Sequence, residues 1–172
     1  MTSRSNSGEA PGGHPPTSST GVERIGAAFE LARDEGRAAL MPYMMAGFPD
    51  RETSLAVAAA YAESGADLVE LGVPFSDPLA DGPTIHAAAT AALAAGATLA
   101  TALETCRSIS DRLPVVLMIY ANMVLAHGGP EEFAAILGAS GAAGAIVPDL
   151  PLGADLAVLA ERQVGDDRAG GS

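Results

Sequence analysis

From residue 22 onward the chain alternates between strand-like and helix-like segments, and this alternation restricts the possible folds more than any other feature. Short apolar stretches of strand length occupy residues 39–46, 66–71, 115–120 and 145–147. Helical patterns lie before, between and after them, at residues 23–35, 50–62, 84–109, 130–138 and 152–162. Strands that alternate with helices predict a parallel sheet with right-handed crossovers. We therefore expect an α/β fold.

Single residues support several of these segments. Asp50 is placed as an N-cap, and Pro130 is placed in a first helical turn. Ile25, Ala28, Phe29 and Ala32 would form one apolar helix face. Pro42 argues against a regular strand over residues 39–46, because proline cannot donate to the ladder.

The second strand–helix unit is longer than its neighbours. The strand centres fall near Leu40, Leu68, Val116 and Ile146, so they are separated by 28, 48 and 30 residues. The second unit therefore carries roughly 20 additional residues. α/β proteins place their functional sites in the loops that follow the carboxyl ends of parallel strands. The loop after the second strand is therefore the first place to look for chemistry.

Three of the carboxylates in this extended unit are candidates for a functional role. Glu70 sits near the end of an otherwise apolar strand, where a charge is costly unless it is paired or functional. Such a position suits a general acid or base, although a structural Glu paired with a neighbouring donor fits the pattern almost as well. Asp77 and Asp81 lie among Ser, Pro and Gly, and the residues alone favour turn or cap roles for both.

The composition excludes several classes of chemistry. All nine basic residues are Arg, so a lysine Schiff base, a lysine-anchored pyridoxal phosphate and a Walker-type phosphate loop are excluded. The formal net charge of −12 makes nucleic acid an unfavourable partner. One cysteine, Cys106, allows no internal disulfide, and three scattered His residues give no metal-ligand spacing, so we expect no metal site.

The two ends of the chain lack core-forming patterns. Residues 1–21 are rich in Ser, Thr, Gly and Pro, predict a disordered arm and do not resemble a signal peptide. Residues 161–172 read as a polar tail. The uncharged run at 87–103 is too weakly hydrophobic for a membrane span, and we expect two helices joined near Gly96. A cytoplasmic protein without membrane contact is predicted.

The extended unit carries a long contiguous motif. Residues 69–85, VELGVPFSDPLADGPTI, resemble the signature of the tryptophan synthase alpha chain family. MPY at 41–43, AGFPD at 46–50, LMIYAN at 117–122 and VPDLP at 147–151 resemble further family segments in the same order. The resemblance covers roughly residues 22–159, and the family also carries a proline at the position of Pro42.

This resemblance implies a (β/α)8 TIM barrel and a cofactor-free lyase. The family's reaction is the aldol cleavage of indole-3-glycerol phosphate to indole and glyceraldehyde 3-phosphate in tryptophan biosynthesis. By resemblance, Glu70 is the general acid/base and Asp81 binds the indole N–H and stabilises its developing positive charge. Tyr43 and Tyr120 line the indole site, and Asp149 lies near its mouth.

The resemblance also implies a partner. In the family the alpha chain joins a beta chain in an alpha2-beta2 tetramer. By resemblance, Pro74, Asp77 and Asn122 face that beta chain.

Residues 22–160 supply about four βα units, whereas a complete barrel has eight and about 250 residues. The pattern contains neither strands five to eight nor the family's phosphate-binding loops, and a frameshift or premature stop is one hypothesis for this. We expect a partial TIM-barrel domain of low stability that self-associates and turns over little. The alternative is an inactive half-barrel that only binds the beta chain. A different phosphate-handling barrel enzyme is a third reading, which the contiguous motif argues against.

Overall fold

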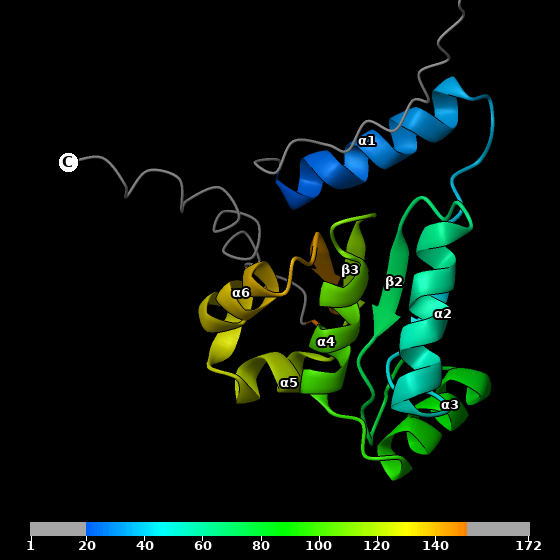
Figure 1. Cartoon of the computed structure of the whole chain (residues 1–172). Helices are drawn as coiled ribbons and strands as arrows, with labels where there is room; N and C mark the ends of the chain where they lie inside the picture. Colours follow the sequence, from blue (N-terminus) through cyan, green and yellow to red (C-terminus); the bar gives the residue numbers. More distant parts are fainter. Residues whose placement is uncertain (1–19, 151–172) are drawn as a thin grey trace, which may run out of the picture.

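The computed structural model describes residues 20–150 (Figure 1). Its elements, in chain order, are α1 (Gly21–Asp34), β1 (Tyr43–Met45), α2 (Arg51–Glu63), β2 (Val69–Gly72), α3 (Pro83–Ala94), α4 (Leu99–Ile109), β3 (Val115–Met118), α5 (Ala121–Ala126), α6 (Gly129–Ala139) and β4 (Gly144–Ile146). The predicted helix at 152–162 and polar tail at 161–172 lie outside the described residues. So does the predicted arm, except for Thr20 and Gly21, which already cap and open α1.

The four strands form one parallel sheet in the order β1-β2-β3-β4, which confirms the predicted α/β fold. Tyr43 is aligned with Glu70, Glu70 with Val116, and Val116 with Gly144 across the sheet. β1 is shorter than the predicted 39–46 because Pro42 has no N–H to donate. Its carbonyl still accepts a hydrogen bond from the Glu70 N–H at 3.0 Å.

The helices form largely as the sequence predicts. Asp50 caps α2 by accepting from the Thr53 N–H at 2.8 Å. The uncharged run divides into α3 and α4, and Gly96 between them adopts the left-handed φ of 86°. Pro130 lies in the first turn of α6. The short helix α5 was not predicted.

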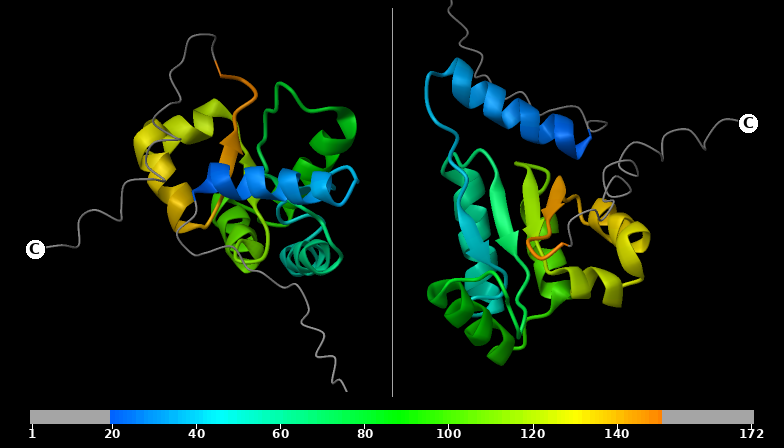
Figure 2. Two further views of the ribbon diagram at one scale, coloured as in Figure 1. Left: turned by 90° about the horizontal axis from the view of Figure 1, so that it is seen from above. Right: turned by 180° about the vertical axis from the view of Figure 1, so that it is seen from behind.

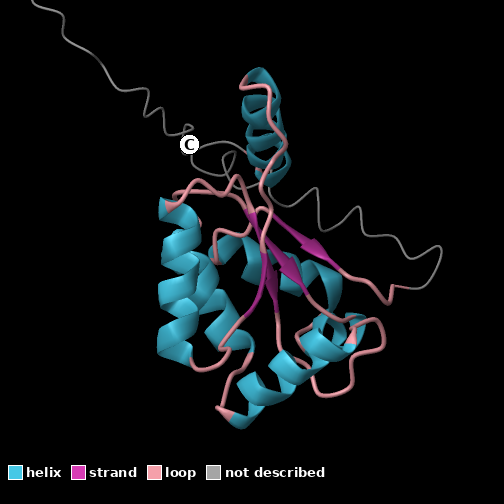
Figure 3. Ribbon diagram, turned by 90° about the vertical axis from the view of Figure 1, so that its right-hand side faces the viewer, coloured by secondary structure: helices cyan, strands magenta, loops and turns pink. Residues whose placement is uncertain are grey.

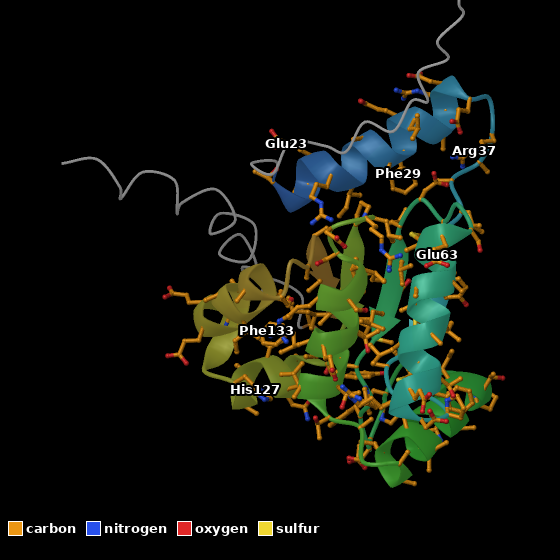
Figure 4. All side chains as sticks on the ribbon, in the orientation of Figure 1. Glu23, Phe29, Arg37, Glu63, His127 and Phe133 are labelled. Atoms are coloured by element: carbon orange, nitrogen blue, oxygen red, sulfur yellow. The ribbon has the colours of Figure 1, made fainter. Side chains whose placement is uncertain are left out.

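One face of the sheet is covered by helices, and the main core lies there (Figure 3). Val69, Leu71, Val115 and Leu117 point to this face and are fully buried. α2, α4, α5 and α6 supply the opposing side chains, among them Ala58, Cys106, Val124, Phe133 and Leu137. Figure 4 labels Phe133 on α6. Because side chains alternate along a strand, the residues between these positions face the other side of the sheet.

α1 lies across the amino ends of the strands, away from the loops that follow their carboxyl ends (Figures 1 and 2). Arg24 fixes it there by donating to the carbonyls of Gly141 and Leu113, each at 3.1 Å, and of Ser110. Ala32 is buried as predicted, but Phe29 is 47% exposed. The predicted apolar face is therefore only partly covered, because this helix packs on strand ends and not on a sheet face.

No single helix among residues 20–150 is long and apolar enough to cross a membrane. α3 and α4 meet that test of length and composition only as a pair, and the pair is bent by 103°.

Candidate active site

The candidate residues gather where the strands end and the long loops begin. Glu70 lies on β2 between the fully buried Val69 and Leu71, so its side chain faces away from the main core. It is half-buried there, with Tyr43 and Val116 aligned beside it on the neighbouring strands. The predicted position of Glu70 on the second strand is therefore confirmed.

Tyr43 reaches the same site because Gly72, on the adjacent strand β2, leaves room for its ring. Its ring lies over Gly72, and a Cβ at Gly72 would stand only 2.0 Å from Tyr43 Oη. Tyr43 also packs against a small buried cluster that joins β1 to α3 and contains Met45, Ala89 and Ala92. A residue larger than glycine at position 72 would therefore displace the tyrosine from the site.

Asp81 is held by Tyr120 from the end of the third strand. The Tyr120 hydroxyl donates to Asp81 Oδ1 at 2.9 Å and accepts from the Ala80 N–H at 3.2 Å. The Phe75 ring packs against the Tyr120 ring, with centroids 5.3 Å apart and a tilt of 35°. Tyr120 is 1% exposed, so it anchors the whole extended loop to the sheet.

Asp149 follows β4 and turns back toward the same region. Its Oδ1 accepts from the Ala121 N–H, the first residue of α5, at 2.8 Å. A carboxylate at a helix amino terminus is stabilised by the unpaired N–H groups there. Asp149 thus joins the fourth strand to the end of the third.

The electrostatics link these side chains into one cluster. Burial, followed by the charges of Asp81 and Glu70, raises the pKa of Tyr43 well above its usual range. The pKa of Tyr120 is also raised, first by burial and then by its hydrogen bond to Asp81 and the charges of Asp81 and Asp149. Both phenols therefore keep their protons at physiological pH and can act as hydrogen-bond donors.

The residues predicted to face a partner differ in their exposure. Asp77 is exposed in the extended loop and accepts from the Ser76 hydroxyl at 2.6 Å. Asn122 is exposed on α5, whereas Pro74 is buried. Asp77 and Asn122 could contact another molecule directly, while Pro74 would act by shaping the loop.

Two participants could not be recognised from the sequence. Gly72 admits the Tyr43 ring, and Phe75 supports the Tyr120 ring. Both contacts join different segments, and their only sequence signal is membership of the contiguous motif. Within residues 20–150, no three His, Cys, Asp or Glu side chains gather closely enough to hold a metal ion.

An open, mostly apolar hollow of about 530 Å³ lies between the loop after β1 and the start of α3. It is lined by Phe48, Pro83, Thr84, Ala87 and Ala88. None of these is a candidate residue, but Pro83 follows Asp81 by two positions. The hollow lies beside α3 and shares no lining residue with the carboxylate cluster.

The chain is similar in sequence to proteins described as tryptophan synthase alpha chains. The family profile described as tryptophan synthase alpha chain matches residues 29–164. The tryptophan synthase alpha chain of Acidiphilium cryptum is 50% identical over 133 residues, which cover 76% of this chain and 48% of that protein. The alpha chain of Prochlorococcus marinus is 48% identical over 130 residues, which cover 74% of this chain and 47% of that protein. The chain thus spans about half the length of these relatives.

Solved structures agree. A tryptophan synthase structure from M. tuberculosis, in an aminoacrylate- and BRD0059-bound form, superposes with a TM-score of 0.76 at 40% identity, covering 81% of this chain and 57% of that one. The tryptophan synthase subunit alpha of Legionella pneumophila gives a TM-score of 0.75 at 34% identity, covering 82% and 55%. The four-stranded sheet therefore corresponds to about half of a TIM barrel. The chain belongs to the tryptophan synthase alpha chain family.

Proposed function

We propose that the carboxylate cluster cleaves indole-3-glycerol phosphate to indole and glyceraldehyde 3-phosphate. The observation that carries the proposal is the hydrogen bond of 2.9 Å from Tyr120 to Asp81. It holds the loop carboxylate at the same end of the sheet as Glu70, where two acidic groups can serve one ligand. Membership of the alpha chain family supports the choice of substrate.

Each candidate residue has a role in this reaction. Glu70 donates a proton to the indole ring carbon that bears the glycerol phosphate side chain. Asp81 accepts a hydrogen bond from the indole N–H and so stabilises the positive charge that develops on the ring. The resulting Glu70 carboxylate then takes the proton of the adjacent alcohol. The carbon–carbon bond breaks, its electron pair returns to the ring, and the alcohol becomes the aldehyde. Glu70 ends protonated, as it began, and no cofactor takes part.

The surrounding residues shape the site for a flat, neutral ring. Tyr43 lines the indole position, whereas Tyr120, which is 1% exposed, supports the site from behind by holding Asp81. Asp149 fixes the loop after β4 through its bond to α5. The family relatives suggest that a beta chain joins this chain in an alpha2-beta2 tetramer, with Asp77 and Asn122 at the contact.

The proposal is tested by measuring indole release from indole-3-glycerol phosphate by the purified chain, with and without a beta chain. Glu70→Gln should abolish release, and Asp81→Asn should reduce it by at least about 100-fold, the usual loss for a transition-state hydrogen bond. Glu30→Gln is the matched control, because Glu30 is exposed on α1 at the far end of the strands. Release that is equal in Glu70→Gln and the wild type would refute the assigned role.

A second candidate function is binding of the beta chain without catalysis. It is favoured by the exposure of Asp77 and Asn122. Here the wild type and Glu70→Gln would bind a beta chain equally and release no indole. Co-sedimentation with a beta chain separates this function from the first.

A further inference from the structure

One buried polar atom stands out in the described chain. Tyr43 Oη is the only solvent-inaccessible side-chain nitrogen or oxygen among residues 20–150 that has no hydrogen-bond partner within that range. Buried polar groups are nearly always paired, because an unpaired donor costs about 1–3 kcal/mol. A donor in this position is therefore expected to serve a group that lies outside residues 20–150, such as a bound ligand.

The surroundings hold this hydroxyl in place. The ring lies over Gly72, and Tyr43 also packs against the small buried cluster that contains Met45 and Ala89. Tyr43 is also aligned with Glu70 on the adjacent strand and shares its side of the sheet. The hydroxyl thus lies at the same site as the proposed acid/base.

The charges nearby restrict what the outside group can be. The titratable groups that interact electrostatically with the Tyr43 hydroxyl are Asp81, Glu70 and Tyr120. Two carboxylates disfavour a phosphate or another anion at this point. An alcohol fits, since its oxygen can accept from Tyr43 while its own hydrogen is donated to a carboxylate.

We propose that Tyr43 donates a hydrogen bond to the oxygen of a ligand alcohol whose proton is directed to Glu70. This inference rests on the proposed function, in which the alcohol is the one next to the indole ring. As Glu70 removes the alcohol proton and the carbon–carbon bond breaks, negative charge develops on that oxygen. Tyr43 keeps its own proton throughout and stabilises this charge.

The test compares two ligands that differ at the alcohol. Indole-3-glycerol phosphate carries it, whereas indole-3-propanol phosphate has hydrogen in place of both glycerol hydroxyls. Dissociation constants of both are measured by calorimetry for the full wild-type chain, Tyr43→Phe and Tyr61→Phe, with released indole monitored so that only intact ligand is counted. Tyr61 lies on α2 and packs against the helix-side core, so its variant controls for loss of a phenol elsewhere.

Tyr43→Phe should raise the dissociation constant of indole-3-glycerol phosphate about tenfold and change that of indole-3-propanol phosphate less than twofold. This difference is the one expected for the loss of one hydrogen bond. Its melting temperature should equal or exceed that of the wild type, because an unpaired buried donor is removed. An equal effect on both ligands, or none on either, overturns the role of Tyr43 and leaves the proposed function standing. If the folded wild type binds neither ligand, the proposed function and this inference both fail.

Discussion

At the scale of single residues, the site depends on contacts that join segments far apart in the sequence. Tyr120 follows the third strand, yet its hydroxyl holds both Asp81 and the Ala80 N–H in the loop after the second. Tyr43 reaches the same region because Gly72 leaves room for its ring. Carboxylates supply the proposed chemistry, but aromatic residues determine where those carboxylates lie.

Tyr120→Phe tests the first of these contacts. The variant removes one bond to a charged carboxylate and one from a backbone N–H, so unfolding free energy should fall by about 1–3 kcal/mol. Indole release should fall as well, because Asp81 loses its fixed orientation. Urea unfolding and the indole assay measure the two effects. Tyr61→Phe is the control, and a Tyr120→Phe chain that equals it in both assays would contradict the prediction.

Gly72→Ala tests the second contact. The added Cβ would meet Tyr43 Oη at 2.0 Å and Cζ at 2.7 Å, so the ring must move. We expect a loss of about 1–3 kcal/mol in unfolding free energy and weaker ligand binding. Gly26→Ala is the matched control, because nothing lies within 4 Å of its added Cβ. That change should stabilise α1 by about 0.5–1 kcal/mol. A tolerated Gly72→Ala with unchanged binding would show that Tyr43 need not lie over residue 72.

Residue positions within the site were only partly predictable from the sequence. Glu70 and Asp81 could be identified because they lie in one contiguous motif. The contact between Tyr43 and Gly72 depends on the register of two strands, and no residue in either segment encodes that register locally.

At the scale of elements, an ion pair joins the segment before β1 to the start of β2. Arg37 binds both oxygens of Asp67, at 2.6 and 2.8 Å, and the Leu40 N–H donates to the same carboxylate at 2.7 Å. The Asp67 side chain is only 5% exposed. These contacts fix the register at which the first strand enters the sheet.

Asp67→Asn should lower unfolding free energy at pH 7 by about 1.5 kcal/mol, the low end for charged hydrogen bonds, because the Arg37 side chain is 39% exposed and screened by solvent. The bond to Arg37 holds the pKa of Asp67 below its ordinary value. The stabilisation is therefore complete above the unfolded pKa of about 3.9 and is lost as pH falls through the folded pKa.

Urea unfolding of wild type and variant between pH 7 and pH 2 measures this difference. The gap between the two should stay constant down to about pH 5 and close at the acid end. Asp111→Asn, at an exposed position before β3, is the control and should show no gap. A gap that is the same at pH 2 and pH 7 would mean that the carboxylate charge is not what stabilises this junction.

The order of helices and strands could be predicted from the sequence, but the residues at which they begin and end could be predicted only in part. Capping residues such as Asp50 marked helix starts well, because the cap is a local interaction. β1 ends where its pairing with β2 ends, and α5 is a single short helix stabilised by tertiary contacts. Neither feature has a strong local signal.

At the scale of the whole molecule, the sheet is covered unequally. On the helix-side face Val69, Leu71, Val115 and Leu117 are fully buried, whereas the face that carries Glu70 leaves Val116 half-buried and Ile146 42% exposed. Among residues 20–150, β1 and β4 each pair with one neighbour only. Parallel sheets are normally covered on both faces, and unpaired edges promote association.

We therefore expect the chain to self-associate as its concentration rises, which sedimentation velocity can detect. Ile146→Asp should shift the equilibrium toward monomer by placing a charge on the exposed face. Val22→Asp places the same charge on α1, at a residue that is 67% exposed, and should have little effect. A wild type that stays monomeric at every concentration would contradict the prediction.

Whether the proposed residues form one ligand site is tested most directly by mapping a ligand onto the chain by NMR, which a chain mass of 17.1 kDa permits. Indole-3-propanol phosphate is added to labelled full-length chain, and shifts are followed for Tyr43, Glu70, Asp81, Tyr120 and Asp149. We expect these five signals to move together with one dissociation constant, while the signal of Glu30 on α1 does not move. Saturable shifts confined to other residues, or no shifts in the folded chain, would show that these residues do not form one ligand site.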